Sequence, residues 1–209
     1  MPRMWSRDKG PGECGYCGTL ITFKESKNST KTFHREAKSR LLDMQMSIIT
    51  LNGEQLNELR DNGLHMPKYD TKMELAKASF SEVAFDARSL FIPHSGGKTF
   101  AEQQMMVSRY SEILRKNIQT NSIQVKIPTA IDLTSVINQL PEDVLITQFH
   151  RSNTIYQART QSQYGVCLAQ LYIDIDGARG SRFSTYLDTY LRPQDKDASL
   201  GVIPIIYPA

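Results

Sequence analysis

The sequence predicts a mixed α+β fold, with helices mainly in the first half of the chain and strands mainly in the second. Two helix starts support the helical part: Thr71–Glu74 and Thr99–Glu102 have the spacing of a capping box, in which a Thr and a Glu satisfy each other's backbone N–H groups. A long, largely apolar run at residues 166–175 predicts a buried central strand. A helical half followed by a strand-rich half is typical of α+β domains.

The helices predicted in the first half lie near residues 34–48, 54–61, 72–88 and 100–117. The first follows from a partly helical spacing of apolar residues around Leu41, and Asn52-Gly53 ends it. The last two follow their capping boxes with apolar residues at three- and four-residue steps, as an amphipathic helix requires.

In the second half, alternation of apolar and polar residues predicts further strands at residues 122–127 and in parts of 144–149 and 154–159. Residues 181–191 carry aromatic and apolar residues on one side of a possible last helix. The apolar tail at residues 202–207 is interrupted by Pro204, which predicts packing at a sheet edge in this chain or in a neighbouring subunit.

Charge is distributed unevenly along the chain. The 209 residues carry a net charge of +3, but residues 1–40 hold nine Lys or Arg against four Asp or Glu and therefore carry +5. The remaining residues carry −2. We therefore divide the chain into a basic N-terminal segment, residues 1–40, and an α+β body, residues 41–209. A basic end on a slightly acidic body predicts a polyanionic or acidic partner, and a solvated basic tail is the simpler alternative.

The cysteine content and the absence of long apolar runs indicate an intracellular protein. Three cysteines, an odd number, argue against a disulfide framework and favour a reducing compartment such as the cytoplasm or nucleus. The first residues lack the apolar stretch of a signal peptide, and no run approaches the roughly 18 apolar residues of a membrane span.

Cys14 and Cys17 form the most compact candidate site. Two thiolates separated by two residues can bind one tetrahedral zinc ion, and His34 on the same segment is the best third ligand. A second cysteine pair is missing, so unligated reduced cysteines remain an alternative. A redox pair is less consistent with the sequence, because such a site needs a strand before the cysteines and a helix after them.

A glycine-rich loop supplies a different hypothesis. Gly96-Gly97-Lys98-Thr99 precedes a capped helix, and such loops can bind phosphate through free amides. The full motif requires Gly six residues before the Lys, where this chain has Ile92. A turn followed by a helix cap is therefore the favoured interpretation of the loop. Asp174 and Asp176, two residues apart on the predicted central strand, could hold a magnesium ion or end the strand at a turn.

No catalytic constellation is complete, so we expect a non-enzymatic structural or assembly protein that forms oligomers. Its basic segment would contact nucleic acid or an acidic protein surface, with zinc as a possible stabilising ion; a viral structural protein is one class that fits. The alternative is a phosphate- or nucleotide-handling enzyme using Lys98. The predicted nucleic-acid-binding residues are Arg3, Arg7, Lys9, Lys24, Lys27, Lys31, Arg35, Lys38 and Arg40.

Overall fold

The structure, a computed structural model, describes residues 32–51, 64–65, 82–149, 153–162, 165–174, 184–191 and 193–209. Its helices are α1 (Arg35–Asp43), α3 (Phe100–Ile118), α4 (Ala130–Ile137) and α5 (Glu142–Phe149). Its strands are β1 (Ser47–Thr50), β2 (Leu64–His65), β3 (Glu82–Phe85), β4 (Ile123–Lys126), β5 (Gln157–Ser162), β6 (Gly165–Asp174), β7 (Ser184–Leu191), β8 (Leu200–Gly201) and β9 (Ile205–Pro208). The described residues therefore form a mixed α+β fold, as the sequence predicts, with mainly antiparallel strand pairs.

A four-stranded antiparallel sheet, in the order β1-β3-β9-β4, lies at the centre of the described residues. Its interior strands are buried on both faces. In β3, Val83 and Phe85 face one apolar core while Ala84 faces another. In β9, Ile206 faces the same core as Ala84 and lies in register with it. Strands buried on both faces have nearly continuous apolar sequences, which hides the two-residue period of a strand.

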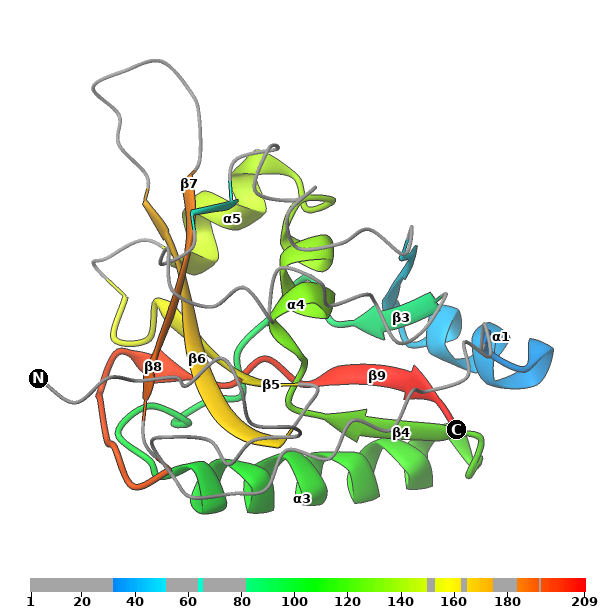
Figure 1. The fold of residues 1–209 in the computed structure, drawn as a ribbon. Coiled ribbons are helices and arrows are strands. Elements are labelled where there is room, and N and C mark those ends of the chain that lie inside the picture. The colour runs from blue at the N-terminus through cyan, green and yellow to red at the C-terminus, as the bar shows by residue number, and fades with distance from the viewer. Residues whose placement is uncertain are drawn as a thin grey trace, which may run out of the picture.

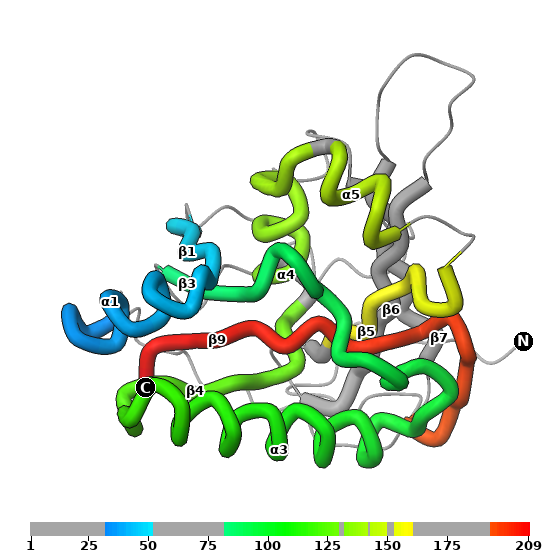
Figure 2. The backbone as a smooth tube through the Cα atoms, turned by 180° about the vertical axis from the view of Figure 1, so that it is seen from behind, coloured from blue at the N-terminus to red at the C-terminus, as the bar shows by residue number. Residues whose placement is uncertain are grey.

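Helix α3 covers one face of this sheet and runs alongside β4 and β9 (Figures 1 and 2). The predicted capping box is present: Glu102 N–H donates to Thr99 Oγ1 at 3.3 Å, and Thr99 N–H donates to Glu102 Oε2 at 2.7 Å. The side chains buried on α3 follow three- and four-residue spacings and face the sheet: Phe100, Gln103, Val107, Ser111, Leu114 and Ile118. The predicted helix at 100–117 is confirmed.

Helix α4 lies on the opposite face of the sheet, where Leu133 and Val136 pack against Val83 and Phe85 in a common core. A buried hydrogen bond joins the two layers, because Tyr207 of β9 donates its hydroxyl to Asp132 Oδ2 at 3.1 Å. Burial raises the pKa of the Tyr207 hydroxyl well above its ordinary value, with the neighbouring Asp132 as a further cause, so Tyr207 stays protonated as a donor.

The second sheet has the order β2-β7-β6-β5-β8, and its three long strands pair antiparallel. β6 lies between β7 and β5, which confirms the predicted central strand near 166–175. β5 continues into the core of the molecule, where Ala158 is fully buried together with Phe91 and Ile203.

Two of the four helices predicted in the first half are wrong in part. The helix near 34–48 stops at Asp43, and Gln45, with φ of 60°, turns the chain into β1. Met46 and Ile48, two residues apart on that extended segment, contact the same core. Residues 82–85 of the helix near 72–88 form β3; its earlier residues lie outside the described part of the chain. The helix near 54–61 also lies outside it.

The second half differs from the prediction at three places. Residues 184–191 form β7, not a last helix, and pair with β6. Residues 142–149 form helix α5 rather than a strand. The tail does not lie at a sheet edge, because β9 pairs with both β3 and β4. Predicted strands near 122–127 and 154–159 correspond to β4 and, in part, to β5.

Candidate functional site

The described residues include the last part of the predicted basic segment. Arg35, Lys38 and Arg40 all lie on α1. The other six predicted basic residues, and both predicted cysteine ligands, lie outside the described residues: Arg3, Arg7, Lys9, Lys24, Lys27 and Lys31, with Cys14 and Cys17. Helix α1 is therefore where the structure joins the basic segment to the body.

Glu82, the first residue of β3, binds the N-terminal end of α1. Its carboxylate accepts a hydrogen bond from Phe33 N–H at 3.1 Å. It also forms an ion pair with Lys38 Nζ at 2.6 Å. The Glu82 side chain is only 14% exposed, so water screens this contact less than it would at an open surface. Phe33 and Ala37 are buried in the same core as Ala84.

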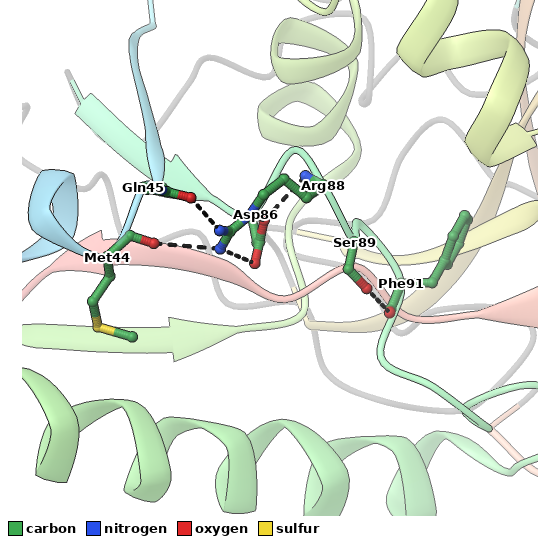
Figure 3. Close-up of polar contacts among 6 residues, drawn as sticks. All are labelled: Met44, Gln45, Asp86, Arg88, Ser89 and Phe91. Carbon is green, nitrogen blue, oxygen red and sulfur yellow. Dashed lines mark hydrogen bonds and ion pairs between the residues drawn. The ribbon is translucent and has the colours of Figure 1, made fainter.

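Arg88, just after β3, binds the chain at the C-terminal end of α1 (Figure 3). It is held in a bidentate pair with Asp86, with Nε–Oδ1 and Nη2–Oδ2 distances of 2.9 Å. It also donates to Gln45 Oε1 at 2.6 Å and to Met44 O at 3.3 Å. The Arg88 hydrogen bond lowers the pKa of the Asp86 carboxyl below its ordinary value of 3.8. Residues at or just beyond the two ends of β3 thus contact α1 and the residues on either side of it.

Arg40 joins α1 to the C-terminal end of α3. Its Nη1 donates to Ile118 O at 2.5 Å and to Gln119 O at 3.2 Å, and its Nη2 pairs with Glu36 at 2.5 Å. The last carbonyls of a helix have no partner within the helix, so a cation there satisfies them and interacts favourably with the helix dipole. Lys38 and Arg40 therefore have structural contacts, whereas Arg35 is exposed and makes no hydrogen bond or ion pair with another described residue.

His34, the predicted third zinc ligand, is the N-cap residue of α1. Its side chain is exposed and makes no capping hydrogen bond. Within the described ranges, no group of three His, Cys, Asp or Glu side chains is placed to hold a metal ion. Of the three predicted zinc ligands, the structure places only His34; Cys14 and Cys17 lie outside the described residues.

The glycine-rich loop is packed against residues 193–199. Gly97 N–H donates to Asp197 O at 2.7 Å, Phe100 N–H donates to Pro193 O at 2.9 Å, and Thr99 N–H is used by the capping box. A Cβ on Gly96 would lie 2.1 Å from Ala198 O, which excludes any larger residue there. Amides with internal partners are not available to a phosphate, so this geometry favours a structural turn and helix cap.

A buried polar cluster beneath this loop was not predicted. Arg159 of β5 is fully buried and donates from Nη2 to Asp195 O at 3.0 Å and, more weakly, to Lys98 O at 3.4 Å. Gln103 of α3 is also buried and bonds Ser95 O and Leu200 O. Burial lowers the pKa of Arg159. No local pattern separates such residues from exposed polar ones, because three of their four carbonyl partners lie 36, 61 and 97 residues away in the sequence.

The remaining predicted acidic pair cannot be assembled. Asp174 ends β6, in register with Ser184 of β7, and Asp176 lies outside the described residues.

Comparison of the chain with protein-family models, curated proteins and solved structures gave no match. Within the described ranges, every helix is too short or too polar to cross a bilayer.

Proposed function

We propose that this chain is a non-enzymatic structural or assembly protein whose basic N-terminal segment contacts nucleic acid, with an acidic protein surface as the alternative partner. The observation that carries the proposal is the charge distribution: residues 1–40 hold +5 while the rest of the chain holds −2. Viral structural proteins are one class with this combination. Clustered Lys and Arg near aromatic residues favour phosphate contact and base stacking.

The attachment of α1 supports this assignment. The contacts of Glu82, Arg88 and Arg40 fix α1, which carries the last three basic residues of the segment, to the folded body. Since Lys38 and Arg40 are engaged in those contacts, we propose that Arg35 and the six basic residues before it contact the polyanion.

Zinc binding by Cys14, Cys17 and His34 is part of the same proposal. His34 lies at the exposed start of α1 and makes no capping hydrogen bond, so the helix cap does not occupy its imidazole. A metal bound there would fix the fold of the basic segment next to its attachment point. Cysteine thiolates and an imidazole are ligands that zinc prefers.

Two charge-matched triple variants test the nucleic-acid role in the full-length protein. One replaces Lys24, Lys27 and Lys31 with Gln, and the other replaces Lys68, Lys72 and Lys77 with Gln. Both remove three positive charges, but only the first changes the proposed binding segment. We expect the first to weaken binding to a single-stranded oligonucleotide by about tenfold or more, and the second by less than about threefold. Equal losses would show that total charge, not the segment, governs binding, and would contradict the proposal.

A further inference from the structure

The outward face of α3 is the most unusual exposed surface among the described residues. Among the described residues, four large apolar side chains are exposed: Leu42 on α1, Ile146 on α5, and Met105 and Ile113 on α3. Two of them, Met105 and Ile113, lie eight residues apart on α3, at 65% and 52% exposure. Because the opposite side of α3 packs against the sheet, these two side chains project away from the sheet.

Charged residues complete this face. Arg109, Glu112 and Lys116 are exposed and make no ion pair or hydrogen bond with another described residue. This contrasts with Lys38, Arg40, Arg88 and Lys196, which all have acidic partners. Together with Met105, the three charged residues follow steps of four, three and four along the helix, so they lie along one seam of its surface that a partner helix can contact.

We propose that a second copy of this chain docks on this face, with the two α3 helices antiparallel about a two-fold axis between residues 110 and 111. This deepens the assembly role proposed above and rests on it. In this arrangement Arg109 of each copy lies opposite Glu112 of the other, which gives two equivalent ion pairs at the centre. Met105 lies against the aliphatic stem of Lys116, and Ile113 flanks the seam. An isologous interface requires such self-complementarity.

The alternative register, centred on Arg109, places the two Arg109 side chains opposite each other and is disfavoured by like-charge repulsion. The face also limits the strength of the contact. A helix of 19 residues is about 28 Å long, and one helix face offers less than the roughly 800 Å² per partner of a standard interface. The dimer should therefore be weak and should form only at high protein concentration.

Charge exchange in the full-length protein tests the register. Sedimentation equilibrium over a concentration series measures dimerisation for the Arg109→Glu and Glu112→Arg variants and for the double variant that carries both changes. Each single variant should raise the dimer dissociation constant by about fivefold or more, because like charges then meet across the axis. The double variant should restore it to within about twofold. Single and double variants that behave alike would overturn the proposed register.

Ile113→Arg and Leu42→Arg form a matched pair, since both replace a helical apolar side chain that is half exposed, at 52% and 53%. Ile113→Arg should abolish the dimer and Leu42→Arg should leave it unchanged; circular dichroism confirms that both remain folded. If the protein self-associates and neither variant has an effect, the surface is wrong but the assembly role survives. If the unmodified protein is a strict monomer at every concentration, both this inference and the assembly role fail.

Discussion

Arg88 shows how one side chain can join elements that are distant in sequence. Its guanidinium forms a bidentate pair with Asp86. It also donates to Gln45 and Met44, more than 40 residues earlier in the chain. A planar guanidinium can serve several acceptors at once, which an ammonium group cannot do with the same geometry. The same region contains the Lys38–Glu82 pair, so two cations link α1 and the residues that follow it to β3 and the residues that follow it.

Replacing Asp86 with Asn should destabilise the protein in a pH-dependent way. Because the pKa of Asp86 is lowered in the folded state, its stabilising effect is present above the ordinary pKa of 3.8 and is lost as the pH falls below it. Near neutral pH, we expect the melting temperature to fall by about 2 °C, as is usual for a largely exposed ion pair. Thermal melts of both proteins over a pH series check this, and a difference that persists well below pH 3.8 would contradict it.

Single residues were the hardest level to predict. Arg35, Lys38 and Arg40 look equivalent in the sequence, yet two have structural partners 44 and 78 residues away and the third is exposed. Nothing local distinguishes them, because the partner carboxylate and carbonyls approach only when β3 and α3 pack beside α1. The composition therefore shows that the segment is basic, but it does not show which of these three side chains have structural partners.

Elements with local signals were predictable. The start of α3 depends on two side chains three residues apart, and both hydrogen bonds of its capping box are present. The strands were harder. β3 depends on partners that are distant in sequence, and its apolar residues face two different cores. An interior strand of this kind has no clear two-residue period, so its residues were mistaken for one face of a helix.

Thr99→Ala should therefore weaken α3 at its first turn. The change removes the acceptor for Glu102 N–H, and the loss of an N-cap side chain costs about 1 kcal/mol in the free energy of unfolding. Thr99→Ser keeps the hydroxyl and serves as the matched control. Urea unfolding of the three proteins measures the effect. Equal destabilisation by Ala and Ser would show that the methyl group of Thr99, not its capping bond, is what matters.

At the scale of the whole molecule, the sequence predicted the α+β class but not the order of strands. Chain order differs from sheet order in both sheets: β9, the last strand, lies between β3 and β4, and β2 pairs with β7 across more than 100 residues. No pattern within a window of ten or twenty residues can specify such pairings. The uneven distribution of charge, by contrast, can be counted from the sequence without knowing the fold, and the proposed function rests on it.

The most direct test of that function is the salt dependence of nucleic-acid binding by the full-length protein. Each phosphate contact contributes a slope of about −0.7 to a plot of log affinity against log salt concentration for single strands. With roughly five contacts from the seven proposed basic residues, affinity should fall about a hundredfold between about 50 and 200 mM salt. An affinity that does not change with salt, or no binding at the lower salt concentration, would contradict the proposal.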